Sequence, residues 1–348
     1  MKDKINIRPV TEVAEYHDCE AIQKKVWKFQ DREIIPVNEL ITIQRSGGLV
    51  LGAFDGNRMV GFAFGFMGKT EVSRCKQFGQ LIHSSRMLAV LPEYRNYAIG
   101  FRLKLAQRDF ALKQGVKLIT WTFDPLQSLN AFFNISKLGV TVKKYFVNLY
   151  GNSSSVLNKD VPTDRFLAEW DITSGRVRER LMPVGQAYIT RTSRSPEALT
   201  RYFVNRREER RLLARASGKP AGSQQTTDKI KLDSGITGIP MAFRTVSQVL
   251  KGKVNYVVFN RQGLPVSAGP KLKLASEIIF VEIPYDFNRI LHKDNKLAID
   301  WRLKTRLIFT HYFGKGYRVV DVLSPQFLGQ GSRTSFYIMR RHKPVSVK

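Results

Sequence analysis

Cysteine is scarce in this sequence, and long apolar runs and metal-binding patterns are absent from it. Cys19 and Cys75 are the two cysteines in 348 residues. They are too few for a disulfide framework or a cysteine zinc site, so we expect a reduced compartment. The five histidines show no HxxxH or HExxH spacing, and we expect no protein-bound metal. No run of about 18 apolar residues occurs, so no membrane span is expected.

The N-terminus also lacks the apolar segment and small-residue cleavage site that direct export. The opening residues, MKDKINIRPV, lead directly into a mixed polar and β-branched segment. We therefore expect a cytoplasmic protein. A hydrophobic fraction of 43% and a mean hydropathy of −0.24 are typical of a globular chain, and the length is sufficient for two domains.

Acidic residues are few beside basic ones. The 57 Lys and Arg against 29 Asp and Glu give a net charge of +28. Residues 1–150 hold 22 basic and 13 acidic side chains (+9), and residues 151–348 hold 35 and 16 (+19). This excess favours polyanionic partners, which include nucleic acid, acidic surfaces and phosphate-rich cofactors. Arg201–Arg215 is predicted to form a basic helical stripe. A solvated helix explains it most simply, and the alternatives are contact with nucleic acid, with acidic lipid or with an anionic cofactor.

The hydrophobic pattern predicts an α/β layered domain over residues 1–172, then a basic helical and linker insertion over 173–235. A C-terminal α+β region over 236–348 is expected to complete the fold or the acceptor site. Strands are predicted over 5–9, 49–54, 59–66, 80–90, 116–123, 255–259, 276–283, 317–323 and 335–339. Helices are predicted near Thr11, after Pro36, and over 100–114, 125–138 and 294–313.

A short internal repeat connects the two parts of the chain. Phe101–Lys104 (FRLK) recurs as Trp301–Lys304 (WRLK), and each tetrapeptide lies in a predicted helix that is followed by a glycine and a strand. Shared helix chemistry explains the repeat most simply. The alternative is a degenerate second copy of the first fold, which would lack the turn described next.

Met87–Gly100 places a strand, a polar turn and a helix start in succession. Unpaired N–H groups of such a turn converge where the helix dipole is positive, so the segment predicts an anion site for a pyrophosphate. The small side chains of Ala98 and Gly100 leave room for phosphate oxygens to reach the amides. The alternative is an ordinary strand-to-helix connection at the surface.

Arg95-x-x-Ala98-x-Gly100 resembles motif A of the GNAT superfamily of acyltransferases, with alanine in place of the first glycine. Residues 5–172 more narrowly resemble a cluster of bacterial GNAT acetyltransferases. The blocks that carry this resemblance are WTFDPL at Trp121–Leu126, Asn130 and Asn134, Leu138-Gly139, Tyr150-Gly151, Pro162–Arg165 and Glu169-Trp170.

The resemblance implies a mixed, mostly antiparallel sheet flanked by helices, in which the motif A strand splays from the next strand. It also implies an acyl-CoA-dependent N-acyltransferase that uses acetyl-CoA or succinyl-CoA and a small, amino-acid-like amine. The alternative is a catalytically altered relative that binds nucleic acid through its basic half. The implied coenzyme A contacts are Leu88, Ala89 and Val90 along the pantetheine arm and Arg95, Asn96, Tyr97, Ala98, Ile99 and Gly100 around the pyrophosphate.

Acyl transfer needs a deprotonated amine and a proton donor for the thiolate that leaves. The tyrosine that many GNAT enzymes use would fall at Ile135. Either Tyr145, Tyr150 or a water molecule replaces it, or proximity of the reactants supplies most of the acceleration. His83 is the candidate base, although a lone histidine on a strand is more often structural. Asp124 follows the strand predicted over 116–123. It is placed either to orient an ammonium group or to cap the following helix.

Four further polar residues are candidates for binding. Asn130 and Asn134 stand four apart on one helical face, where they suit the pantetheine amides or local backbone groups. Arg165 suits a carboxylate on the acceptor or on a dicarboxylic acyl group, or a surface pair with Asp164. Arg86 occupies the place where the resembling cluster has a histidine, and is a candidate for substrate contact.

Overall fold

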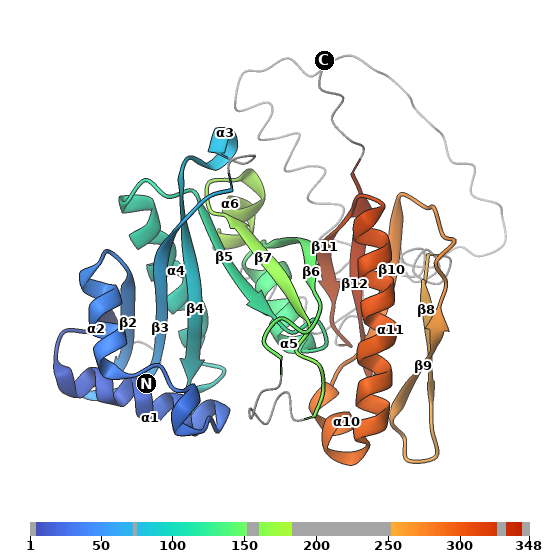
Figure 1. The fold of residues 1–348 in the computed structure, drawn as a ribbon, viewed down its shortest axis with the longest axis horizontal. Helices are drawn as coiled ribbons and strands as arrows, with labels where there is room; N and C mark the ends of the chain where they lie inside the picture. The colour runs from blue at the N-terminus through green and yellow to red at the C-terminus, as the bar shows by residue number, and fades with distance from the viewer. Residues whose placement is uncertain (1–4, 72–74, 152–159, 183–251, 326–331, 343–348) are drawn as a thin grey trace, which may run out of the picture.

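The computed structural model describes residues 5–71, 75–151, 160–182, 252–325 and 332–342 (Figure 1). The first part of the chain forms β1 (Ile5–Pro9), α1 (Val13–Trp27), η1 (Asp31–Glu33), α2 (Val37–Arg45), β2 (Leu49–Asp55), β3 (Arg58–Lys69), α3 (Cys75–Phe78), β4 (Leu81–Val90), η3 (Pro92–Tyr94), α4 (Ile99–Lys113), β5 (Leu118–Phe123), α5 (Ser128–Ala131), η4 (Phe132–Lys137), β6 (Thr141–Phe146), β7 (Arg165–Asp171) and α6 (Gly175–Leu181). The second part forms β8 (Asn255–Phe259), β9 (Pro265–Pro270), β10 (Ile278–Pro284), α10 (Phe287–Lys293), α11 (Asn295–Gly314), β11 (Tyr317–Leu323) and β12 (Thr334–Arg341).

One ten-stranded sheet runs through both parts in the order β1-β2-β3-β4-β5-β7-β6-β11-β12-β10. Its neighbouring strands are antiparallel except for β4 and β5, which are parallel. β8 and β9 form a separate hairpin. Helices flank the sheet (Figure 1). The predicted fold class, a mixed and mostly antiparallel sheet flanked by helices with a C-terminal α+β region, is confirmed.

The first core cluster surrounds β2, β3 and the start of α4. Consecutive residues of β2 and of the first half of β3 are buried, and Leu103 of α4 and Tyr16 of α1 pack into the same cluster. α4 packs across β2, β3 and β4, while α1 packs against α2, β3 and β4. This packing fixes the start of α4 beside the end of β4, which is the predicted anion turn.

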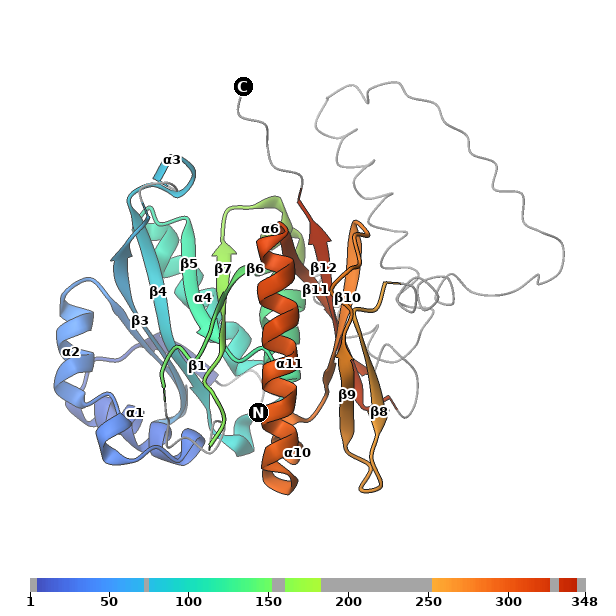
Figure 2. The ribbon, with the colours of Figure 1, turned by 45° about the vertical axis from the view of Figure 1, so that its right-hand side comes forward.

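The second core cluster joins the two parts of the chain. Phe166 of β7 meets Phe309 of α11 with ring centroids 4.6 Å apart, and Tyr337 of β12 lies 5.5 Å from Phe166. All three side chains are buried. α11 covers β6 and β11 and also packs against β9 (Figure 2). The C-terminal part therefore contributes half of the core on which β6 and β7 rest.

The two copies of the internal repeat have similar local structure but differ in the order of their strands in the sheet. α4 and α11 are each followed by a glycine with positive φ, Gly115 at 72° and Gly316 at 81°, and then by a strand. β4 and β5 are direct neighbours, whereas β12 lies between β10 and β11. Within the described residues, the repeat extends to a helix–glycine–strand connection and not to strand order.

Some predicted elements differ from the structure. The helix predicted over 125–138 begins at Ser128 and becomes π-helical from Phe132 to Lys137, because Asp124 and Pro125 form a turn before it. The described strand β9 was not predicted, because prolines bound its short sequence. The basic segment Arg201–Arg215 lies outside the described residues. Among those residues, no helix is long and apolar enough to cross a membrane.

Candidate active site

The turn before α4 has the geometry of an anion site. Asn96 and Ala98 adopt left-handed conformations with φ of 72° and 57°. The N–H of Arg102 donates to the carbonyl of Ala98 at 3.0 Å, so the N–H groups of residues 99–101 precede the first helical hydrogen bond. The N-cap residue Ala98 provides no side-chain cap. Free amides and the positive end of the helix dipole therefore coincide here.

Gly100 allows α4 to approach β4 closely. A Cβ atom at Gly100 would lie 3.3 Å from Leu88 Cδ2 and 3.9 Å from Val90 Cγ2. A larger side chain there would press on β4 at the turn. Leu88 lines the pocket described next, so the start of α4 lies against a residue of the pocket wall.

β4 and β5 separate soon after they meet. Their parallel pairing is limited to His83 with Ile119 and Ser84 with Thr120. On its other edge β4 pairs with β3 and contains a bulge. Phe64 of β3 pairs with Met87 and the next residue, Gly65, pairs with Ser85, so Arg86 is the extra residue of β4. From Ser85 onward, the edge of β4 that faces β5 has no strand partner among the described residues. An added extended chain can therefore pair with it.

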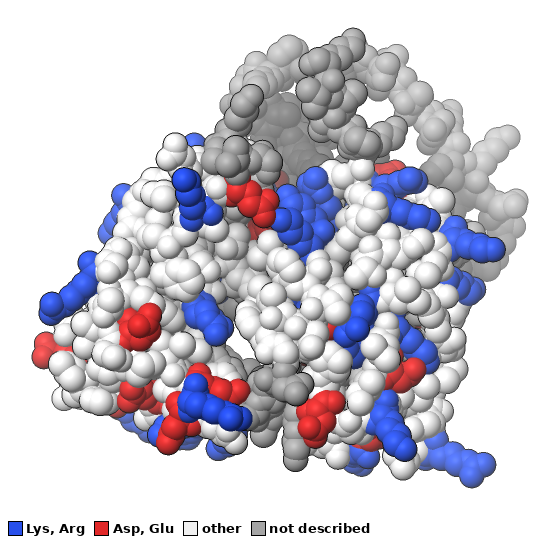
Figure 3. Space-filling model, viewed as in Figure 1, with Lys and Arg blue, Asp and Glu red and all other residues white. Residues whose placement is uncertain are grey.

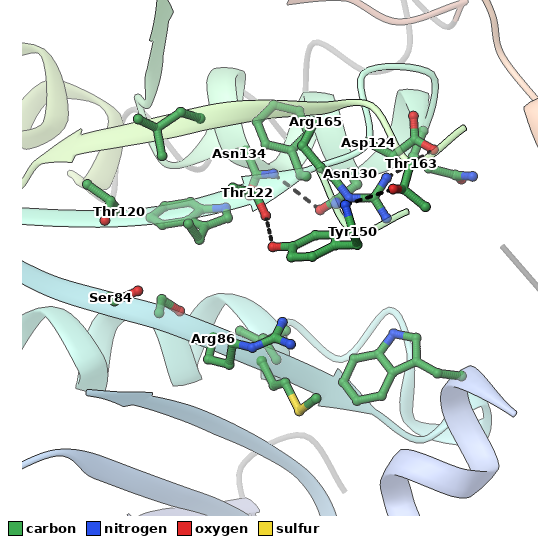
Figure 4. A pocket seen from close by; sticks show the side chains of 18 of the residues that line it. Ser84, Arg86, Thr120, Thr122, Asp124, Asn130, Asn134, Tyr150, Thr163 and Arg165 are labelled. Carbon is green, nitrogen blue, oxygen red and sulfur yellow. Dashed lines mark hydrogen bonds and ion pairs between the residues drawn. The ribbon is translucent and has the colours of Figure 1, made fainter. Parts of the chain in front are cut away.

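A pocket of about 680 Å³ opens where the two strands separate. Ser84 and Arg86 of β4 face Thr120 and Thr122 of β5 across the gap, and Tyr150 lies between them (Figure 4). The remaining polar lining is Arg32, Glu33, Ser85, Lys104, Asp124, Gln127, Asn130, Asn134, Thr163 and Arg165.

His83 lies away from this pocket, contrary to the predicted role as a base. Its side chain is fully buried, Nε2 is 3.0 Å from Gln107 Nε2, and the ring meets Phe110 edge-on. Burial and the nearby Lys104 lower the pKa of His83 to about 4. His83 therefore has a structural role, in which its neutral ring packs between β4 and α4.

Asp124 lines the pocket, but arginines occupy its carboxylate. Arg302 of α11 donates to both oxygens at 2.7 Å, and Arg165 Nη1 is 3.7 Å from Oδ2. Burial favours the neutral carboxyl, yet Arg302 and Arg165 hold the pKa of Asp124 below its usual value. The group predicted to orient an ammonium therefore positions the pocket wall. It also accepts the N–H of Leu126 at 2.8 Å, although it is not the N-cap of α5.

Tyr145 is also outside the pocket lining and is unsuited to the predicted catalytic role. Its hydroxyl donates to Asp164 Oδ2 at 2.6 Å, and its ring stacks on Phe309. Burial and the Asp164 carboxylate raise the pKa of Tyr145 well above its ordinary value. Asp164 is itself buried and accepts two hydrogen bonds of 2.9 Å from Arg306, so it belongs to the protein interior and not to the predicted surface network with Arg165.

Tyr150 is the phenol that the pocket presents. It is 47% exposed, and its hydroxyl is 2.7 Å from Thr122 Oγ1 (Figure 4). The guanidinium carbons of Arg86 and Arg165 lie 5.7 Å and 5.5 Å from its ring centroid. The sequence places Tyr145 and Tyr150 in one segment, and only the fold separates a core residue from a pocket residue.

Asn130 and Asn134 reach the pocket together from α5 and η4. Asn134 Nδ2 donates to Asn130 Oδ1 at 3.3 Å (Figure 4). Of the predicted pantetheine contacts, Leu88 lines the pocket, while the side chain of Ala89 is buried in the first core cluster. Ala89 and Val90 can therefore contribute through the backbone edge of β4.

Lys104 is a pocket residue that sequence reasoning missed. Charged side chains of a helix usually face solvent, but the structure buries Lys104 to 3% exposure. Nζ donates to Ser85 Oγ at 2.8 Å and Gln107 Oε1 at 3.0 Å, and lies 3.7 Å from the ring centroid of Trp121. Burial lowers the pKa of Lys104 to about 7. No periodicity signals this placement, because it depends on the gap between β4 and β5.

Basic side chains are frequent on the surface of the C-terminal part. Residues 252–342 contain fifteen Lys or Arg and six Asp or Glu. Figure 3 shows many of the basic side chains on the face that carries α11, interspersed with a few acidic ones. In that view they do not merge into one continuous stripe.

Comparisons with known proteins give structural similarities only. No protein-family model matches this chain, and no curated protein matches its sequence. The ribosomal-protein-S18-alanine N-acetyltransferase of Escherichia coli aligns with 14% identity and a TM-score of 0.37 over 49% of this chain and 96% of its own. An N-acetyltransferase of Staphylococcus aureus Mu50 aligns with 14% identity and a TM-score of 0.37 over 49% and 99%. Arabidopsis thaliana NAA60, solved with a bisubstrate analogue, aligns with 13% identity and a TM-score of 0.38 over 48% and 97%.

Proposed function

We propose that this protein is a GNAT-type N-acyltransferase, which transfers an acyl group from acyl-CoA to the amine of a small acceptor. One observation carries the proposal. The uncapped N-terminus of α4, with its left-handed turn, stands beside an unpaired strand edge that borders a polar pocket. A pyrophosphate joined to an extended amide-containing arm matches both features, and the motif A resemblance of the same residues supports coenzyme A.

In this proposal the amides of residues 95–100 bind the pyrophosphate. The pantetheine arm pairs with the backbone edge of Leu88–Val90 and receives further hydrogen bonds from Asn130 and Asn134. The thioester then lies in the gap between β4 and β5, close to the bulge at Arg86.

The reaction is direct transfer in a ternary complex. The neutral amine attacks the thioester carbonyl, a C–N bond forms, the C–S bond breaks, the nitrogen releases one proton to water, and the coenzyme A thiolate takes one proton. We assign the proton donation to Tyr150, whose hydroxyl lies in the pocket beside Thr122. Holding the amine and thioester together supplies much of the remaining acceleration.

The acceptor is expected to be amino-acid-like. Arg86 and Arg165 flank Tyr150, and guanidinium groups suit a carboxylate next to the reacting amine. The ion pair of Asp124 with Arg302 keeps this wall in place.

A thermal-shift titration with coenzyme A and acetyl-CoA at fixed ionic strength tests the proposal. We expect a stabilisation of about 2.7 kcal/mol at a ligand concentration 100 times Kd. Gly100→Asp should abolish it, since the side chain presses on Leu88 and puts a negative charge at the phosphate site. Gly175→Asp, at the start of α6 with open space around it, is the matched control.

Release of free thiol over a panel of amines then measures turnover. The alternative function, binding of nucleic acid through the basic half, predicts a different result in the same experiments. Absence of stabilisation by every coenzyme A species, together with RNA or DNA binding that weakens steeply with salt, would refute the acyltransferase proposal.

A further inference from the structure

Lys104 is a buried ammonium group with no acidic partner in the described part of the chain. Its hydrogen-bond acceptors are the neutral oxygens of Ser85 and Gln107, and its other close contact is the ring of Trp121. A buried charge without a counter-charge costs several kcal/mol. A neutral side chain of similar length would pack at this position of α4 without that cost, so the fold alone does not explain a lysine here.

The location of Lys104 is the closed end of the gap between β4 and β5. Ser85 follows Ser84, the last residue of β4 that pairs with β5, and Trp121 follows its partner Thr120. Along β4 the gap widens from Ser85 toward Leu88 and the anion turn. An extended thioester whose phosphates bind at that turn would reach the closed end with its acyl group.

Polar side chains and the ring of Trp121 surround this closed end. Ser84, Ser85 and Thr120 line it together with Lys104. An acyl group that ends in a methyl would leave the ammonium with neutral acceptors only, whereas an anionic end supplies the missing counter-charge.

We propose, on the basis of the acyltransferase function above, that the acyl donor is a short dicarboxylic acid monothioester of coenzyme A, and that Lys104 binds its terminal carboxylate. Lys104 is then the residue that determines acyl specificity. The transfer itself is unchanged, because the amine attacks the thioester carbonyl while the distal carboxylate stays paired with Nζ.

The groups that face Lys104 are His83 from β4, Trp121 from β5 and Gln107 from α4 itself. His83 is neutral at physiological pH, so a bound carboxylate would meet Lys104 without competition. Carboxylate binding favours the protonated amine. Affinity for a dicarboxylic donor should therefore be highest below pH 7 and fall as the pH rises above it, whereas affinity for a neutral donor should not change in this way.

Calorimetric titration of the full chain with paired donors tests the inference. The pairs are malonyl-CoA with propionyl-CoA and succinyl-CoA with butyryl-CoA, which differ by a carboxylate in place of a methyl. We expect at least tenfold tighter binding of one carboxylated donor at pH 6.5, and a smaller preference at pH 8.5. Lys104→Met and Lys104→Gln should remove the preference while unacylated coenzyme A binds within about twofold of wild type.

The comparison of paired donors in the wild-type chain tests the inference even where a variant fails to fold. Equal binding within both pairs overturns the inference, and so does a preference that persists in Lys104→Gln. If coenzyme A and acetyl-CoA bind without any such preference, the acyltransferase proposal stands and only the specificity is wrong. If no coenzyme A species binds, both proposals fall.

Discussion

At the scale of single residues, two tyrosines five positions apart have opposite roles. Tyr145 donates to a buried carboxylate in the second core cluster, and Tyr150 projects into the pocket. Loss of one hydroxyl should therefore affect stability, and loss of the other should affect catalysis.

Tyr150→Phe should lower kcat by about 10²–10⁴-fold, which is the usual contribution of a positioned proton donor. Tyr145→Phe should leave kcat nearly unchanged and reduce the free energy of unfolding by about 1–3 kcal/mol, because Asp164 loses a buried donor. Steady-state kinetics and urea unfolding of both variants measure the contrast. A full kcat in Tyr150→Phe would contradict the assignment of this tyrosine as the acid.

His83 makes stability depend on pH. The pKa of His83 is about 4 in the folded chain because of burial, and about 6.5 when exposed. Between these values the unfolded state binds a proton that the folded state does not, so stability should fall as the pH drops from 6.5 to 4, by about 3 kcal/mol in total.

Urea unfolding across this pH range measures the effect. His83→Gln should be less sensitive to pH than wild type, and His17→Gln, at an exposed position, should keep the wild-type slope. Equal slopes for wild type and His83→Gln would show that His83 is not the group responsible.

At the scale of elements, α11 positions the site from outside the predicted coenzyme A domain. Arg302→Met should reduce the free energy of unfolding by about 3–5 kcal/mol, because Asp124 would keep a buried charge without its bidentate partner. Lys304→Met is the matched control on the same helix. Its partner Asp300 is 40% exposed, and the expected loss is about 1 kcal/mol.

Guanidinium chloride unfolding gives both values. The double variant Asp124→Asn with Arg302→Met should recover part of the loss, since the carboxylate that lost its bidentate partner is then neutral. A loss in Arg302→Met no larger than in Lys304→Met would mean that the ion pair does not position the pocket wall.

The elements of the fold were largely predictable, and the site was less so. Apolar alternation and turn residues located β1, β8 and β11 at their observed bounds, since these signals are local. The burial of Lys104 and the pairing of Asp124 with Arg302 depend on strand separation and on contacts 178 positions apart. No local pattern reports such contacts, so His83 and Tyr145 were chosen by residue type and proved to be core residues.

At the scale of the whole molecule, a single sheet and a shared core unite the two parts of the chain. A fragment of residues 1–182 should therefore fail to fold cooperatively, because it exposes the edge of β6 and the core side chain Phe166. Near-ultraviolet circular dichroism and size-exclusion chromatography would show the defect.

Co-expression of residues 252–348 should restore a folded complex that retains the ten-stranded sheet. A fragment of residues 1–182 that is monomeric, unfolds cooperatively and binds coenzyme A by itself would contradict the dependence on the C-terminal part.

The two arginines of α11 have a consequence for any exchange of the C-terminal part. Each arginine forms a bidentate pair with an aspartate of the first part of the chain. Arg302 pairs with Asp124, and Arg306 pairs with Asp164. An exchange of the C-terminal part for an unrelated module would remove the bidentate arginine partner of both buried carboxylates. A replacement module would therefore need its own arginines at both positions to supply the same pairing.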